Sequence, residues 1–248
     1  MKRVAIIAAM PGELKPFLDA NAKEGWTHER RGNVKLWRLI WSLDQGEWIA
    51  ACAGAGEDAA TRAFAEVEKD GPVSRVISTG WAGALSEVYQ PGQAYHVSEV
   101  IDARTGERFA ADSTDRFPRS QNRDLGHPGC SLVTSPTVAD YAEKRRLAAT
   151  YEAGMVDMEA AGLARLAAMR GIPFYCVKGV SDGYSDKLPD FNRFISTDGQ
   201  FRLVRFVVFA LFRPWRWPAL MRMGENSTRA AQAMAASLLD LLNQRFAG

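Results

Sequence analysis

Short apolar runs alternate with segments of helical periodicity along most of the chain. The runs typical of buried strands are 4–9, 34–41, 48–53, 73–79, 95–101, 132–134 and 174–180. Segments 57–69, 139–151, 158–170 and 226–246 carry apolar residues at helical spacing. Residues 102–129 show little periodicity, and we predict a long loop there. Strands that alternate with helices predict an α/β fold with a mixed, mostly parallel central sheet.

No linker, repeat or low-complexity tract divides this pattern, so we expect a single domain over residues 1–248. The apolar run 4–10 could be mistaken for a signal peptide, but it is short and continues into Pro11-Gly12-Glu13, as a first buried strand would. No run approaches the roughly 20 apolar residues that cross a bilayer. We therefore expect a cytoplasmic protein.

The composition is that of a globular protein, with 47% hydrophobic and 24% charged residues among 248. It excludes a disordered, collagen-like or disulfide-scaffold chain. A formal charge of +2 gives no overall attraction to nucleic acid, and none is expected as a partner. The three cysteines, Cys52, Cys130 and Cys176, are far apart and form no zinc or redox motif. We expect neither a metal nor a cofactor.

Three acidic residues, Glu13, Glu159 and Asp182, lie next to predicted strand ends. Ligands of open α/β sheets bind outside the carboxyl ends of the strands, so these carboxyl groups are expected to converge. Paired carboxyl groups suit cleavage of a glycosidic bond, which needs an acid at the leaving group and a base on the incoming water. Partial burial would keep one of them protonated near neutral pH. The pattern alone predicts an acid-lined pocket.

Four motifs around this predicted pocket, taken together and in this order, are typical of one protein family. They are Ala9-Met10-Pro11-Gly12-Glu13, Ser78-Thr79-Gly80-Trp81-Ala82-Gly83-Ala84, Val156-Asp157-Met158-Glu159-Ala160 and Val180-Ser181-Asp182. The chain thereby resembles the purine nucleoside phosphorylase and nucleosidase superfamily, most of all the 5′-methylthioadenosine/S-adenosylhomocysteine nucleosidases, over about residues 3 to 197. The resemblance implies a three-layer αβα nucleoside phosphorylase-like fold, a homodimer, and an N-ribosyl hydrolase that releases adenine from a 5′-modified adenosine.

The resemblance also implies roles for single residues. Glu13 would orient and activate the attacking water, and Asp182 would protonate N7 of the departing purine. Ser181 would hold the Asp182 carboxyl group. The other residues expected to bind the nucleoside are Glu159 at the ribose hydroxyls, Met158 at the sugar face, Val138 and Ala139 at the adenine, Phe191 over the nucleoside, and Trp81, Ala82 and Gly83 beside it.

Each of these residues also has an ordinary structural interpretation. Glu13 could be an exposed acid in the first turn of a helix, Asp182 could cap a helix, Glu159 could face solvent, and Met158 could belong to the core. The histidines have no neighbours at metal-ligand spacing and are interpreted as surface or structural residues: His28, His96 and His127.

The nucleophile could be water or phosphate. Phosphorylases of this superfamily grip phosphate with basic residues, but the arginine expected soon after Glu13 is missing and Ser78 stands in the place of a second one. Trp81 replaces a small hydroxyl residue and would narrow an anion pocket. We therefore favour water, with a purine nucleoside phosphorylase as the alternative. Trp81 also departs from the serine usual in nucleosidases, which leaves a non-catalytic nucleoside-binding or membrane-associated protein as a further alternative.

A basic aromatic segment, predicted as an insertion at about 199–224, has no counterpart in the usual nucleosidases. Residues 201–223 hold five arginines and no acid, and read FRLVRFVVFALFRPWRWPALMRM. They could form a core helix or oligomer contact, a peripheral contact with anionic membrane, or a wall for an apolar 5′ group. Hopanoid-associated members of the superfamily, which act on an adenosylated lipid, look like a precedent for the last two interpretations. Single-stranded nucleic acid is disfavoured by the low total charge.

Overall fold

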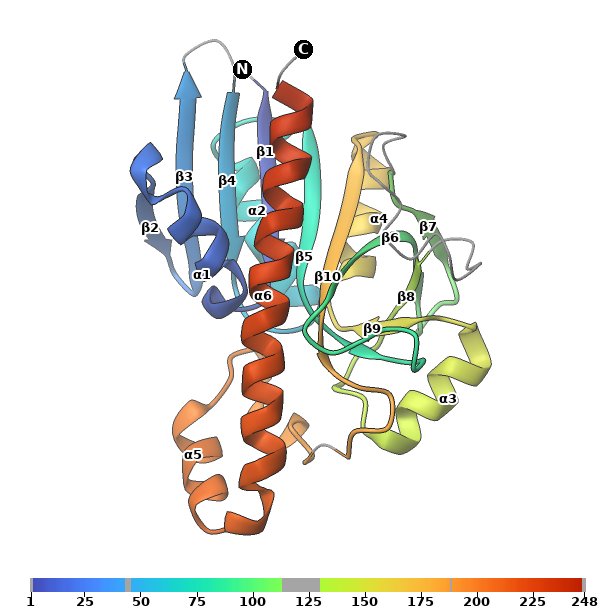
Figure 1. The fold of residues 1–248 in the computed structure, drawn as a ribbon. Coiled ribbons are helices and arrows are strands. Elements are labelled where there is room, and N and C mark those ends of the chain that lie inside the picture. The colour runs from blue at the N-terminus through green and yellow to red at the C-terminus, as the bar shows by residue number, and fades with distance from the viewer. Residues whose placement is uncertain (1, 43–45, 113–129, 188, 247–248) are drawn as a thin grey trace.

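The computed structural model describes residues 2–42, 46–112, 130–187 and 189–246. Two long parallel strands, β5 (Arg75–Ala84) and β10 (Phe174–Asp182), lie side by side near the middle of the molecule (Figure 1). From β5 the sheet continues through β1 (Arg3–Ala8), β4 (Gly46–Cys52), β3 (Val34–Ser42) and β2 (Thr27–Arg31). From β10 it continues through β6 (Ala94–Asp102), β8 (Cys130–Thr134) and β9 (Met155–Asp157).

Strand β9 pairs back with β5, so this second part of the sheet closes into a circuit. The short strand β7 (Arg108–Ala110) is attached to β6 outside the circuit. Among the described residues, five strand pairs run parallel and five run antiparallel. The predicted mixed α/β sheet is confirmed, but parallel pairs are not in the majority, because a β2–β3–β4 meander and the antiparallel closures at β6 and β9 balance them.

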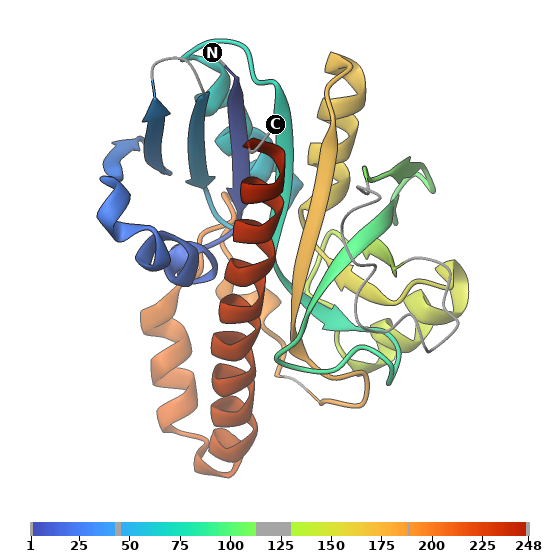
Figure 2. The ribbon, with the colours of Figure 1, turned by 45° about the horizontal axis from the view of Figure 1, so that its top comes forward.

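Helices cover both faces of the open part of the sheet, which gives the three layers that we predicted (Figures 1 and 2). Helices α1 (Pro11–Ala20) and α6 (Trp217–Phe246) lie on one face, and α2 (Glu57–Glu68) and α4 (Ala160–Arg170) lie on the other. The residues of β1 alternate between the two resulting cores: Val4 and Ile6 pack toward α1 and α6, whereas Ala5 and Ile7 pack toward α2 and α4. A strand buried on both faces needs the unbroken apolar run that the sequence shows.

Helix α3 (Tyr141–Tyr151) packs against the closed part of the sheet through Leu147. The Asp140 carboxylate caps this helix by accepting from the Glu143 N–H at 2.9 Å. The described residues also form three short 3₁₀ helices, η1 (Ala22–Glu24), η3 (Asn192–Phe194) and η4 (Pro214–Arg216).

Two predicted strands proved too short. Strand β5 continues to Ala84 and β10 to Asp182, so both glycine- and acid-containing motifs lie in strands rather than in the loops after them. The predicted loop 102–129 contains β7, and residues 113–129, with His127, lie outside the described residues. Elements that periodicity did not predict are α1, β2, β9 and α5 (Leu203–Leu211).

The basic aromatic segment forms α5, η4 and the beginning of α6, which starts at Trp217 instead of residue 226. These elements extend beyond the sheet at the bottom of Figure 1. No helix in the described part of the chain is long and apolar enough to cross a membrane.

Candidate active site

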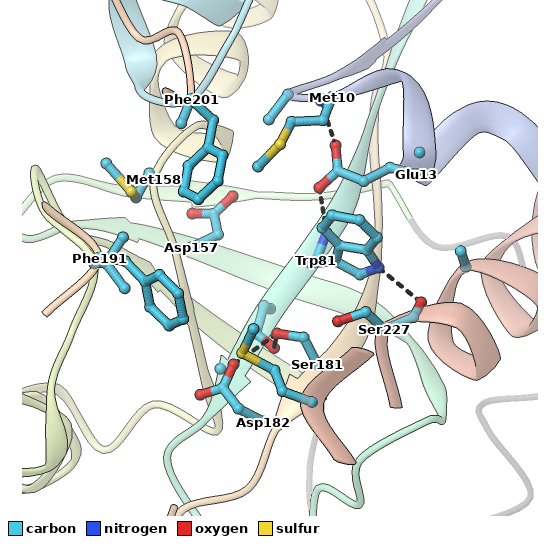
Figure 3. Close-up of a pocket in the computed structure, with 18 of the residues that line it drawn as sticks. Met10, Glu13, Trp81, Asp157, Met158, Ser181, Asp182, Phe191, Phe201 and Ser227 are labelled. Carbon is cyan, nitrogen blue, oxygen red and sulfur yellow. Dashed lines mark hydrogen bonds between the residues drawn. The ribbon is translucent and has the colours of Figure 1, made fainter. Parts of the chain in front are cut away.

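One cavity of about 920 Å³ lies where the carboxyl ends of β1, β5, β9 and β10 come together. Its walls are completed by the beginning of α1, the loop after β8, and residues of α5 and α6 (Figure 3). Glu13, Glu159 and Asp182 all line it, as do the other residues that the sequence singled out: Trp81, Ala82, Gly83, Val138, Ala139, Met158, Ser181 and Phe191. The three acids are far apart in the sequence and share one hollow.

Glu13 is held by two backbone N–H groups at the edge of the cavity. The Met10 N–H donates to Oε2 at 2.7 Å and the Trp81 N–H donates to Oε1 at 2.8 Å (Figure 3). The first bond caps α1, so the beginning of this helix fixes the carboxyl group. Glu13 is 4% exposed. Burial raises its pKa above the ordinary value, and the bonds from Trp81 and Met10 oppose that rise.

Glycine at position 80 leaves room for the Glu13 carboxyl group. Its φ is 139°, a region that favours glycine, and a Cβ atom there would lie 2.9 Å from Glu13 Oε1. The interpretation of Glu13 as an exposed first-turn acid is therefore wrong.

Asp182 ends β10 and is held by two side chains. The Ser181 hydroxyl donates to Oδ1 at 2.6 Å, and the Lys144 ammonium group of α3 forms an ion pair with Oδ2. Lys144 also donates to the Gly183 carbonyl at 2.7 Å. A Cβ atom on Gly83 would lie 3.0 Å from Asp182 Oδ2, so glycine leaves room for the pair. Asp182 caps no helix, and its carboxyl group faces the cavity.

Glu159 lies at the beginning of α4 and is also buried, so it does not face solvent. Its carboxyl group accepts from the Gly56 N–H at 2.8 Å and from the Met158 N–H at 3.2 Å. Burial and the neighbouring Asp157 raise the pKa of Glu159, and the nearby Lys178 opposes them. Met158, the residue before Glu159, lines the cavity rather than lying wholly in the core.

A fully buried ion pair between Lys178 and Asp157 lies close to Glu159. Lys178 of β10 lies 2.9 Å from Asp157 Oδ2, and both side chains are inaccessible to solvent. Burial lowers the pKa of Lys178, but Asp157 and Glu159 outweigh this effect and raise it above the ordinary value. Thr134 donates to the other Asp157 oxygen at 2.7 Å. Lys178 therefore stays charged and offsets part of the negative charge around the cavity.

Trp81 fills the space between α1 and α6. Its indole N–H donates to the Ser227 carbonyl at 2.9 Å, and the ring lies 3.4 Å from the place of a Cβ atom on Gly12 (Figure 3). Among the described residues that line the cavity, the cations are Lys15 and Lys144, and each is paired with a carboxylate. The site thus offers little to an anion.

The backbone of Val138, which lines the cavity, already forms hydrogen bonds with a side chain. The Asn192 side chain accepts from the Val138 N–H at 2.8 Å and donates to its carbonyl at 3.0 Å. Both Val138 and Ala139 line the cavity, as does the adjacent Phe191. The backbone N–H and carbonyl of Val138, one of the two residues expected at the adenine, are therefore occupied by a carboxamide in this structure.

Lys144, Lys178 and Asn192 are the site residues that sequence reasoning missed. Lys178 left a signal, because a lysine inside an otherwise apolar predicted strand needs a buried partner. Lys144 left none, since it precedes two arginines in a predicted helix and nothing in the sequence marks it as buried. No group of His, Cys, Asp and Glu residues in the described ranges could hold a metal ion.

Comparisons with known proteins agree with this architecture. A sequence model of the family described as "Phosphorylase superfamily" matches residues 3–144 and 126–203. The fold is similar to that of a Helicobacter pylori 5′-methylthioadenosine/S-adenosylhomocysteine nucleosidase, crystallised in complex with a nucleoside analogue, at 14% identity and a TM-score of 0.72, covering 98% of each chain. A search of curated proteins returned no sequence match.

Two further solved structures have the same fold. A 5′-methylthioadenosine nucleosidase from Arabidopsis thaliana is 16% identical, with a TM-score of 0.70 over 98% of this chain and 95% of that one. A futalosine hydrolase from Helicobacter pylori is 14% identical, with a TM-score of 0.72 over 98% of both chains. At these identities the likeness is one of fold.

Proposed function

The chain belongs to the phosphorylase superfamily, and on that premise we propose that it is an N-ribosyl hydrolase that releases adenine from a 5′-modified adenosine. The observation that carries the proposal is the convergence of Glu13, Glu159 and Asp182 on one cavity. Fold alone does not assign a reaction. The arrangement of the three acids around one cavity supports the reaction, because it can offer one carboxyl group to each part of a nucleoside.

In this reaction a water molecule attacks C1′ as the bond from C1′ to N9 of the purine breaks. Asp182 is paired with Lys144 in this structure, so it takes up a proton from solvent before the step. It gives this proton to N7, and the electron pair of the broken bond leaves on a neutral adenine. Glu13 accepts the proton of the water, and the ribose departs with a hydroxyl group at C1′. Acid and base assistance of this kind contributes about 10²–10⁴-fold for each group.

Glu159 is proposed to hold the ribose. The backbone N–H groups of Gly56 and Met158 fix its carboxyl group at the cavity wall. Ribose hydroxyls that donate to it would place C1′ between Glu13 and Asp182. Such positioning lowers the activation free energy, because the translational and rotational entropy of the substrate is lost on binding and not in the reaction step. Met158 lies beside this point and would cover the sugar face.

Water is the better nucleophile for this site than phosphate. Phosphate needs cations that are free to bind it, whereas Lys15 and Lys144 are both paired with acids. The indole ring of Trp81 also lies close to Gly12, in the motif that contains Glu13. These contacts support hydrolysis.

One observation favours a second candidate substrate. The cavity continues from Trp81 to the apolar side chains of Phe201, Leu203, Phe206 and Met223. An apolar 5′ substituent would bury itself there, which fits a methylthio group and also a longer, lipid-linked adenosine of the hopanoid type. A phosphorylase that acts on such a substrate is the runner-up. A homodimer and a cytoplasmic location stay predictions.

The test is a panel of 5′-substituted adenosines, incubated with and without phosphate and analysed for free adenine and for the sugar product. We expect adenine and free sugar without phosphate. Formation of ribose 1-phosphate would replace hydrolase by phosphorylase, and tight binding without turnover would reject an enzyme. Asp182→Asn should remove most of the activity, whereas Asp58→Asn, at an exposed site on α2, should retain it.

A further inference from the structure

Helix α5 carries an apolar outer surface that none of the described residues covers. Its inner residues Phe206 and Phe209 pack on Phe194 of η3, with ring centroids 5.5 and 5.1 Å apart. Six outward residues are between 44% and 78% exposed, and we call them the α5 face: Leu203, Val204, Val207, Val208, Leu211 and Phe212. A helix that is apolar on all sides is normally buried, so this face calls for a non-aqueous partner.

Two tryptophans extend the α5 face. Trp215 and Trp217 are 71% and 45% exposed, and the indole N–H of Trp217 donates to the Ala210 carbonyl at 2.9 Å. This bond fixes the turn between α5 and α6. Tryptophan is enriched where a protein meets the boundary between hydrocarbon and water. Met221, on the first turns of α6, is a further exposed apolar residue.

The charges around the α5 face have one sign. Residues 199–224 contain no acid, and their basic residues are five arginines: Arg202, Arg205, Arg213, Arg216 and Arg222. The guanidinium group of Arg213 lies 4.1 Å from the ring centre of Phe209. None of the five forms an ion pair in the described part of the chain. The surface is thus apolar and complementary to anions.

This charge pattern decides between two occupants. A symmetric contact with a second copy through this face would gather the arginines of both copies in one interface, with no acid from residues 199–224 to offset them. An anionic lipid surface meets both requirements, since headgroups attract the arginines and acyl chains accept the apolar side chains. With nine residues, α5 is too short to span a bilayer and would lie along its surface.

We propose that the α5 face, flanked by Trp215, Trp217 and the five arginines, docks the protein onto the surface of an anionic membrane. The inner side of the same helix lines the active-site cavity through Phe206, and Leu203, at one end of the α5 face, lines it as well. Docking would therefore place this wall of the cavity at the lipid boundary. The proposal is independent of the reaction, because it concerns side chains outside the catalytic set.

The experiment is flotation of the full chain with vesicles of phosphatidylglycerol and phosphatidylcholine, compared with phosphatidylcholine alone, at low and high salt. We expect binding to the anionic vesicles that weakens with salt. Arg202→Gln with Arg205→Gln should weaken it roughly 25-fold, from the usual contribution of an arginine near an anionic surface. Val204→Ser, Val208→Ser and Phe212→Ser together should weaken it at least about tenfold.

Matched variants separate docking from general effects. Arg30→Gln with Arg145→Gln removes the same charge from exposed positions on β2 and α3, and Met169→Ser removes an exposed apolar side chain from α4. Both should bind like the unmodified chain, and circular dichroism should show that all variants are folded. Absence of anionic-vesicle binding at low salt, or equal binding by test and control variants, overturns the proposal. So does a dimer in sedimentation that the triple α5 variant dissociates.

Discussion

Lys144 of α3 and Asp182 of β10 form a buried ion pair at the cavity, although they lie 38 residues apart in the chain. When Asp182 gives a proton to a purine, it becomes a carboxylate, and an adjacent ammonium group stabilises that product of the transfer. Lys144 is therefore a positioning residue that acts through Asp182.

Lys144→Met is expected to lower kcat about 10²–10³-fold, because the developing carboxylate loses its counter-ion. KM should change little, since Lys144 is not proposed to touch the ribose or the base. Lys144→Arg keeps the charge and should recover part of the rate. The measurement is steady-state release of adenine, and an unchanged kcat for the methionine variant would show that the pair is only structural.

Glu159 should make stability depend on pH. Because its folded-state pKa is raised from 4.5 to about 8, the folded chain keeps a proton that the unfolded chain loses in this range. The free energy of unfolding contributed by Glu159 therefore falls as pH rises from 4.5 to 8, and Glu159→Gln removes that fall. In thermal melting, the Tm of Glu159→Gln minus the Tm of the parent chain should increase as pH rises across this window. Glu87→Gln, at an exposed position, is the control, and parallel melting curves for Glu159→Gln and the parent would contradict the raised pKa.

Asn192 competes with the base if Val138 binds adenine through its backbone. Two hydrogen bonds are involved, at 2.8 and 3.0 Å, and each has a net value of about 0.5–1.5 kcal/mol. Asn192→Ala should lower KM for adenosine substrates by roughly tenfold, with kcat nearly unchanged. A higher KM would mean instead that Asn192 holds the wall in the shape the substrate needs.

Trp81→Ser tests what excludes phosphate. The substitution removes the ring beside Gly12 and the hydrogen bond to Ser227, but it releases neither Lys15 nor Lys144 from its carboxylate. We expect adenine release to stay independent of phosphate. If phosphate accelerates the variant and ribose 1-phosphate forms, the bulk of Trp81 is what excludes phosphate in the parent chain.

The sequence predicted the part of the site that lies in ordered motifs. Each acid stands beside an apolar strand or at the beginning of a helix, so its place follows from local pattern and from where such strands end. It did not predict the partners. Lys144 reaches Asp182 only because α3 packs on the closed part of the sheet, and that packing depends on long-range contacts such as those of Leu147.

The elements that were missed have equally physical reasons. Strand β9 is three residues long, which is too short for a period to show. Helix α1 contains Pro16, which normally argues against a helix interior. Helix α5 was only one of several readings of the basic aromatic segment, because the run 206–212 is wholly apolar and shows no period of its own.

The circuit formed by β5, β9, β8, β6 and β10 has a consequence for self-association. Strands that pair on both sides have no free backbone groups to offer another chain, and among the described strands this leaves β2 as the outer edge of the open part. That edge reads Thr-His-Glu-Arg-Arg and is largely exposed, and a charged edge resists the addition of a foreign strand. Assembly of two copies by strand pairing along β2 is therefore disfavoured, which leaves the short strand β7, paired only with β6, as the other open edge among the described strands.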